Sequence, residues 1–111
     1  MAALALYIKK LMNIFYSPEK YIKGRFSAIE TDIWYYIKGS ASLKKEAGWK
    51  IYIPYTPQFA ECVLESFLPF LFEKGIHFKY INSQDKLIEL NSGLLGYSQI
   101  GKCLIIYTVG N

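Results

Sequence analysis

The sequence predicts an α+β fold: a small mixed sheet with a central parallel β-α-β unit and helices mainly on one face. Residues 49–53 and 76–81 alternate apolar and polar side chains as strands do. The stretch 58–74 between them has the apolar spacing of a helix. Crossovers of this kind join parallel strands that lie close together. The 111 residues suffice for one hydrophobic core, so 1–111 is expected to be a single domain.

The elements before this unit follow from apolar spacing and breaker residues. Residues 2–15 are predicted to be a helix that ends at Ser17-Pro18, because the residue before a proline avoids helical backbone angles. Residues 25–37 are rich in Ile, Trp and Tyr and predict one or two strands, with Thr31-Asp32 as a turn or bulge between them. Residues 39–47 are polar and predict a loop.

The long helix and the elements after it carry clear start and stop signals. Thr56-Pro57 favours a helix start and Gly75 a left-handed stop. The buried stripe expected on this helix consists of Phe59, Val63, Phe67, Phe70 and Leu71. Residues 83–90 predict a helix, and 91–101 a glycine-rich loop. The last strand, 102–109, is expected at an exposed edge of the sheet, which formation of a homodimer would cover.

Composition narrows the class of protein. A 52% apolar fraction is too high for a disordered chain, and the net charge of +4 weakly favours anionic partners. The N-terminal apolar run is too short to span a bilayer, so no transmembrane segment is expected. Cys62 and Cys103 have apolar neighbours, which predicts two buried thiols and a reduced, cytoplasmic location. The single histidine, His77, has no metal-binding spacing around it, so neither a metal nor a cofactor is expected.

Alternation in the two strands also predicts a polar site. If Trp49, Ile51 and Ile53 face the long helix, then Lys50, Tyr52, His77 and Lys79 share the opposite face. These side chains suit the binding of an anion such as phosphate, because cations neutralise the charge of the anion and supply hydrogen-bond donors to it. Neighbouring ammonium groups also lower each other's pKa. The simpler alternative is a solvated sheet face without a function.

Two stretches carry a resemblance to a known family. The two stretches are GWKIYIPYTPQFAECVLESFLPFLFEKGIHFKYI and, later in the chain, LNSGLLGYSQIGKCLIIY. Together they resemble the N-terminal lyase domain of class III lanthipeptide synthetases, the lyase–kinase–cyclase enzymes. That domain is in turn similar to phosphothreonine lyases. The resemblance covers roughly residues 34–107. Its most specific parts are G-W-K-I, the T-P at the helix start, the F-K of the second strand, and N-S-G…S-Q-x-G-K.

The resemblance implies β-elimination of phosphate from phosphoserine or phosphothreonine in a precursor peptide. It implies that Lys50 is the base and that Lys79 is a phosphate-binding or activating cation. The candidate catalytic residues are therefore Lys50, Tyr52, Lys79 and His77. The candidate substrate-binding residues are Tyr107, Lys102, Tyr97 and Ser98.

Three departures from the family pattern predict a degenerate site. Tyr52 stands where the family has its acid histidine, and His77 is the alternative acid. The loop before S-Q-x-G-K lacks the family's arginine. The chain ends at Asn111, where a family domain continues into further arginines, the kinase and the cyclase, so the domain is expected to be truncated relative to the family. The first hypothesis is therefore a lyase-like domain that binds a peptide, a phosphopeptide, or a kinase or cyclase component.

Two alternatives remain. The first is an active small phosphoserine/phosphothreonine lyase with Lys50 as base and either Tyr52 or His77 as acid. The second is a basic nucleic-acid-binding module, suggested by 12 lysines and ten tyrosines. The basic residues are scattered along the chain and no nucleic-acid-binding motif is present, so nucleic acid is not the expected partner.

Overall fold

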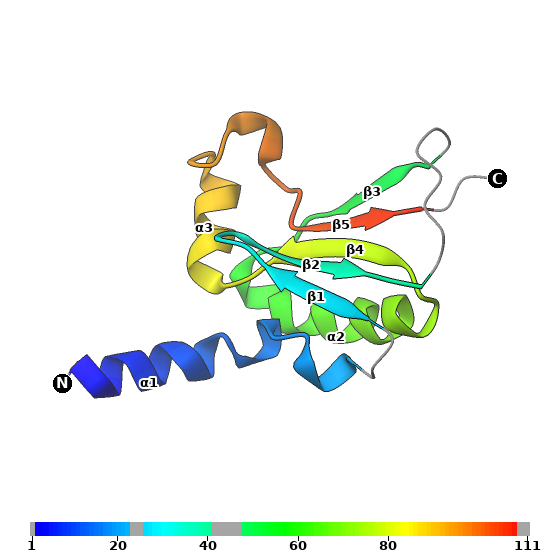
Figure 1. Ribbon diagram of the computed structural model, residues 1–111. Coiled ribbons are helices and arrows are strands. Elements are labelled where there is room, and N and C mark those ends of the chain that lie inside the picture. The colour runs from blue at the N-terminus through cyan, green and yellow to red at the C-terminus, as the bar shows by residue number, and fades with distance from the viewer. Residues whose placement is uncertain (1, 23–25, 41–47, 109–111) are drawn as a thin grey trace.

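A computed structural model describes residues 2–22, 26–40 and 48–108 of the chain. Within these residues, five strands form one sheet in the order β1-β2-β4-β5-β3, and all neighbouring strands are antiparallel (Figure 1). The strands are β1 (Ser27–Glu30), β2 (Trp34–Lys38), β3 (Lys50–Ile53), β4 (His77–Ile81) and β5 (Leu104–Tyr107).

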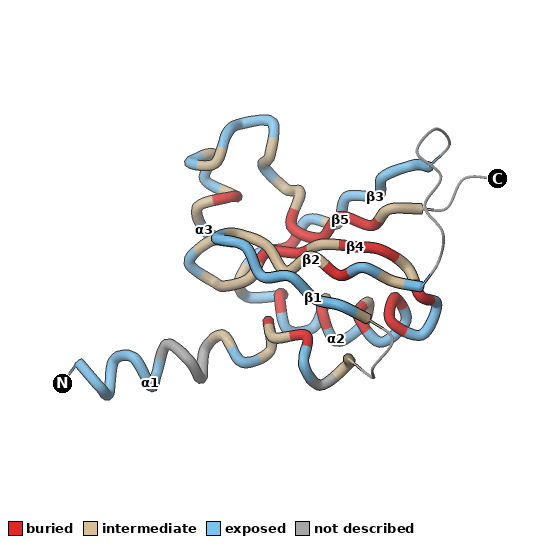
Figure 2. The backbone as a smooth tube through the Cα atoms, viewed as in Figure 1, coloured by how far each residue is buried: buried red, intermediate tan, exposed pale blue. Residues whose placement is uncertain are grey.

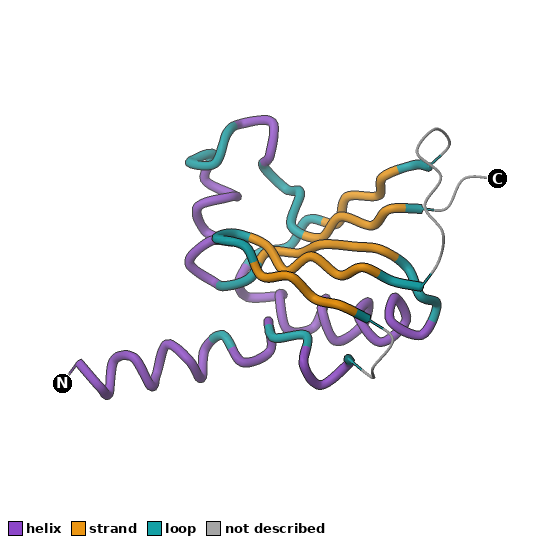
Figure 3. The backbone as a smooth tube through the Cα atoms, in the orientation of Figure 1, coloured by secondary structure: helices purple, strands orange, loops and turns teal. Residues whose placement is uncertain are grey.

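Helices pack mainly against one face of this sheet. The α-helices of the described residues are α1 (Ala2–Met12), α2 (Pro57–Glu73) and α3 (Gln84–Ser92), with 3₁₀ turns η1 (Ile14–Tyr16), η2 (Glu19–Tyr21) and η3 (Tyr97–Gln99). Helix α2 runs below the sheet, α3 stands at one end of it, and α1 extends away from the body of the domain (Figures 1 and 3).

The prediction of a mixed sheet with a central parallel β-α-β unit is wrong, because all neighbouring strands are antiparallel. Strands β3 and β4 run in the same direction, but β5 lies between them and pairs antiparallel with both. Three of the four residues of β5 are buried, whereas three of the four in β3 are exposed. The more apolar strand therefore takes an interior position, where both of its edges are hydrogen-bonded. The last strand is consequently not an edge strand, so no homodimer is needed to cover it.

The hairpin between β1 and β2 turns where the sequence predicted. The Thr31 hydroxyl accepts hydrogen bonds from the backbone N–H groups of Ile33 (3.3 Å) and Trp34 (2.9 Å). Threonine favours turns because its hydroxyl can satisfy nearby backbone donors in this way. The predicted division of this stretch at Thr31-Asp32 is confirmed.

The buried stripe of α2 differs from the predicted one. The buried residues are Ala60, Leu64, Leu68, Leu71 and Phe72. Phe59 and Phe70, which the spacing predicted to be buried, are more than half exposed. The two stripes are offset by about one residue, and α2 is apolar enough to satisfy both. Periodicity cannot choose between them, because the choice depends on where the sheet lies.

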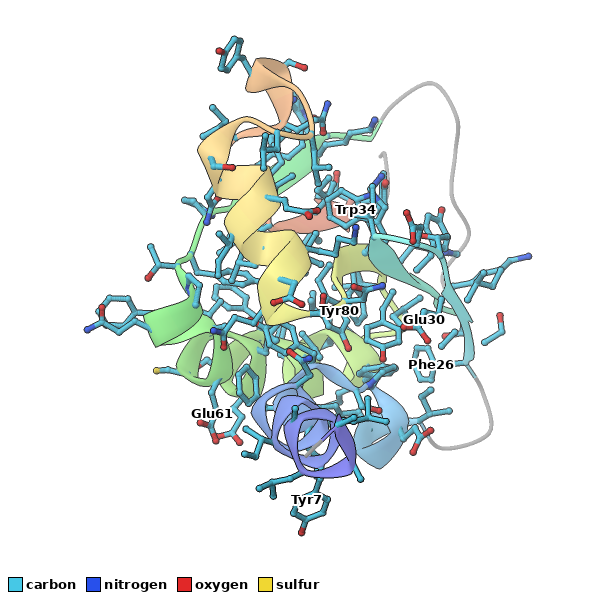
Figure 4. The ribbon with its side chains drawn as sticks, turned by 90° about the vertical axis from the view of Figure 1, so that its left-hand side faces the viewer. Tyr7, Phe26, Glu30, Trp34, Glu61 and Tyr80 are labelled. Atoms are coloured by element: carbon cyan, nitrogen blue, oxygen red, sulfur yellow. The ribbon has the colours of Figure 1, made fainter. Side chains whose placement is uncertain are left out.

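Aromatic and aliphatic side chains fill the space between α2 and the sheet. Figure 2 shows buried residues along β4, β5 and the sheet-facing side of α2. The ring of Phe72 packs edge-on against Phe78 (5.3 Å between centroids) and against Phe26 (4.9 Å). The Tyr80 hydroxyl donates a hydrogen bond of 2.6 Å to the carbonyl oxygen of Tyr16, which ties the N-terminal segment to β4. Tyr80 points toward the helices, and Trp34 points to the other side of the sheet (Figure 4).

The two cysteines occupy different environments. Cys103 is buried, as predicted, and its Sγ lies 3.4 Å from both the Tyr55 carbonyl oxygen and Asn91 Oδ1. Cys62 is exposed on α2, so the prediction of two buried thiols is wrong for this residue. Its position follows from the shift of the buried stripe to the neighbouring face of the helix.

Candidate functional site

The face of the sheet opposite α2 carries the polar residues that the sequence singled out. Strand register places Lys50, Tyr107 and His77 in one row across β3, β5 and β4. The next row contains Tyr52, Ile105 and Lys79. Residues directly opposite one another on paired strands project from the same face. The four residues predicted to share a face therefore do so, with β5 between the two pairs.

Strand β2 extends this surface. Tyr36 pairs with Lys79, and Trp34 pairs with Ile81. Lys102, just before β5, reaches the surface because its Nζ lies 4.8 Å from the centre of the Tyr52 ring. We call the resulting surface the lysine face. It consists of Trp34, Tyr36, Lys50, Tyr52, His77, Lys79, Lys102, Ile105 and Tyr107.

Three lysines of this face each lie over an aromatic ring. Lys79 Nζ is 4.6 Å from the centre of the Trp34 ring, and Lys50 Nζ is 5.6 Å from that of Tyr107. Lys102 over Tyr52 completes the set. Such contacts place the ammonium groups close to apolar surface, where a bound anion interacts with them more strongly than it would in bulk water.

Burial and charge perturb two of the titratable groups. Burial, and secondarily the positive charge of Lys50, lowers the pKa of Lys79 below that of an ordinary lysine. Burial raises the pKa of Tyr107, and the neighbouring Tyr36 and Tyr52 raise it further. The Tyr107 hydroxyl therefore remains protonated near neutral pH and can donate a hydrogen bond to an anion.

The remaining candidate residues lie in contrasting positions. His77 is buried, with 4% of its surface exposed, in the same row as Lys50 and Tyr107. Tyr52 is on the edge strand and is exposed. Tyr97 and Ser98 belong to η3, where Tyr97 is 85% exposed and its ring lies beside Gly93. The strand register therefore does not include these two η3 residues in the rows that join Lys50 and Lys79.

Trp34 and Tyr36 were not identified from the sequence. Both lie on β2, and only its pairing with β4 brings them beside Lys79. Alternation within residues 34–38 would have placed them on one face, but nothing local shows that β2 is the neighbour of β4.

The coupling between Lys50 and Lys79 gives a prediction that is independent of function. Replacing Lys50 with glutamine removes a positive charge that opposes the protonated form of Lys79, so the pKa of Lys79 should rise. It should remain below the ordinary lysine value, because burial is the larger cause. NMR titration of the lysine side chains measures this change, and Lys74→Gln on the opposite side of the domain is the control. An unchanged Lys79 pKa in Lys50→Gln would show that the two charges are not coupled.

Comparison with protein families identifies the domain. The family described as RamC, N-terminal domain, matches residues 16–110. This chain belongs to that family. RamC is a lanthipeptide-related synthetase, so the RamC N-terminal domain seen here is related to lanthipeptide synthetases, as the resemblance implied. No curated protein matches the chain.

The family match covers every strand of the sheet and all of the lysine face. It leaves out all of α1, which extends from the body of the RamC N-terminal domain (Figure 1). Among the described residues, none of the helices has the length and apolar character needed to cross a membrane.

Proposed function

We propose that this RamC N-terminal domain is a lyase-like module that binds a phosphorylated peptide on its lysine face. The observation that carries the proposal is the placement of Lys50, Lys79 and Lys102 on one sheet face, each over an aromatic ring. Lys50 and Lys79 repel one another, which contributes to the lowered pKa of Lys79, and a dianionic phosphate would relieve that repulsion. Tyr107 adds a neutral hydroxyl donor in the same row as Lys50.

The lysine face is better suited to holding a phosphopeptide than to breaking it down quickly. Elimination needs an acid that protonates the departing phosphate. Tyr52 occupies the position at which the resemblance expects a histidine, and a tyrosine hydroxyl is a weak acid at neutral pH. His77 is the remaining candidate acid, and it is buried. A kinase component would supply the phosphorylated peptide.

The lowered pKa of Lys79 favours a second candidate function, active phosphoserine/phosphothreonine elimination. In that reaction a neutral lysine removes the Cα proton, the electron pair forms a Cα=Cβ double bond, and phosphate leaves with a proton from the acid. The resemblance assigns the base to Lys50, whereas the lysine whose pKa is lowered is Lys79. An active enzyme should therefore lose turnover in Lys50→Met, in Lys79→Met, or in both.

One experiment tests both candidates. The domain is mixed with a fluorescent phosphoserine peptide, its phosphothreonine analogue and the unphosphorylated peptide, and binding is followed by anisotropy. Mass spectrometry of the same samples detects loss of phosphoric acid. Phosphate-dependent binding with little or no elimination supports the binding module, and rapid elimination supports the second candidate. Equal affinity for phosphorylated and unphosphorylated peptides would overturn both, and tighter binding to a single-stranded oligonucleotide would favour the nucleic-acid alternative.

A further inference from the structure

The outer edge of β3 borders the lysine face. Among the described strands, β3 is the last in the order β1-β2-β4-β5-β3, so only β5 pairs with it (Figure 1). Its side chains are largely exposed, including Trp49 just before the strand, at 81%. Edge strands of this kind present unpaired backbone donors and acceptors to which another extended chain can pair.

Hydrogen bonds show which residues of β3 turn their backbone groups outward. The Thr108 N–H donates to the Trp49 carbonyl oxygen (2.9 Å), and the Trp49 N–H donates to Thr108 Oγ1 (2.7 Å). Both backbone groups of Trp49 therefore face β5. In an antiparallel pair, successive residues turn their backbone groups to opposite sides of the strand. The outward-facing N–H and C=O groups of β3 consequently belong to Lys50 and Tyr52.

The same two residues project their side chains onto the lysine face. We infer that an extended phosphorylated peptide adds to β3 as a sixth, antiparallel strand, with its phosphorylated residue opposite Tyr52. This inference rests on the proposed function and specifies how the peptide is held. A residue opposite Tyr52 exchanges two backbone hydrogen bonds with it and projects its own side chain from the same face. The phosphate then lies beside Lys50 and Lys102, the cations nearest this edge.

The geometry also specifies the neighbours of the phosphorylated residue. Residues on either side of it lie opposite Ile51 and Ile53 and project to the opposite face of the sheet. Ile51 is exposed, and Ile53 is partly exposed. A bound peptide should therefore carry apolar residues immediately before and after the phosphorylated one. Strand addition of this type derives affinity from main-chain hydrogen bonds and specificity from alternate side chains.

Lys79 and His77 lie farther from an added strand. Strand β4 is separated from it by β5 and β3, which amounts to about 14 Å at a spacing of roughly 4.8 Å between strands. The inference therefore assigns the first contact with phosphate to Lys50 and Lys102, and assigns Lys79 a longer-range electrostatic contribution.

Backbone N-methylation of the peptide tests the added strand directly. The probe is a short fluorescent phosphoserine peptide with valine before and isoleucine after the phosphorylated residue. Methylation of the phosphoserine nitrogen removes the hydrogen bond to Tyr52, and should weaken binding roughly tenfold or more. Methylation of the following nitrogen, which points away from β3, should change affinity by less than about threefold. Equal effects of the two methyl groups, or the reverse order, would overturn the inference.

Two variants of the domain provide a matched pair for the apolar contacts. Ile51→Ser on β3 should weaken binding of the valine/isoleucine peptide but not of a peptide with serine at both flanking positions. Ile29→Ser, an exposed apolar residue on the opposite edge strand β1, should affect neither peptide. An Ile51→Ser variant that binds the valine/isoleucine peptide as tightly as the wild type would also overturn the inference. If the unmethylated phosphopeptide does not bind the wild-type domain at all, the proposed function itself fails.

Discussion

Replacing Lys50 and Lys102 together with alanine is expected to weaken binding of a phosphoserine peptide by roughly a hundredfold. Hydrogen bonds to charged groups contribute about 1.5–3 kcal/mol each, and each factor of ten in affinity corresponds to about 1.4 kcal/mol. Affinity for the unphosphorylated peptide should change little, because the two ammonium groups have no anion to contact. Isothermal titration calorimetry with both peptides measures the difference.

A second double variant separates this local effect from the change in net charge. Lys74→Ala with Lys86→Ala removes the same two charges from α2 and α3, away from the lysine face. It should weaken phosphopeptide binding only slightly, and less still at higher salt. If the two double variants lose the same affinity, the phosphate is attracted by the overall basic charge and not by the lysine face.

A large effect on stability is expected at Phe72. Phe72→Ala should lower the free energy of unfolding by about 3–5 kcal/mol, because it removes a buried ring and leaves a cavity. The Phe72 ring is 5% exposed and contacts Tyr21, Phe26 and Phe78. Urea denaturation followed by circular dichroism measures the change.

Phe70 provides a matched control two residues away on the same helix. It is 52% exposed, so Phe70→Ala should cost roughly 1 kcal/mol or less. The stripe predicted from the sequence included Phe70 and omitted Phe72, whereas the structure buries Phe72. A larger loss of stability from Phe70→Ala than from Phe72→Ala would favour the predicted stripe over the observed one.

The sequence was sufficient where the relevant rule is local. Alternation within two short strands predicted that Lys50, Tyr52, His77 and Lys79 share one face, and they do so although β5 lies between the two strands. The faces coincide because β5 is antiparallel to both strands and preserves the register of alternate residues. Turn and cap chemistry was also local: the Ser83 hydroxyl accepts from the Lys86 N–H at the start of α3, as expected of an N-cap.

The sequence was insufficient where the structure depends on which strands, distant in the chain, pair with one another. Nothing in residues 102–109 shows that this strand separates β3 from β4, since a βαβ crossover can also join strands that are not neighbours. For the same reason the sequence did not identify Trp34 and Tyr36, which reach the lysine face only because β2 pairs with β4. Exposure of Cys62 and Phe59 depended on the orientation of α2 over the sheet, which its own periodicity leaves open.

The central claim is that the lysine face is the surface on which a phosphorylated peptide binds. NMR chemical-shift mapping during titration with a phosphoserine peptide tests it most directly. The largest perturbations are expected at Lys50, Tyr52, Lys102 and Tyr107, with a smaller change at Lys79, and they should be absent with the unphosphorylated peptide. Perturbations confined to α1 or to the exposed face of α2, with the lysine face unchanged, would contradict the claim.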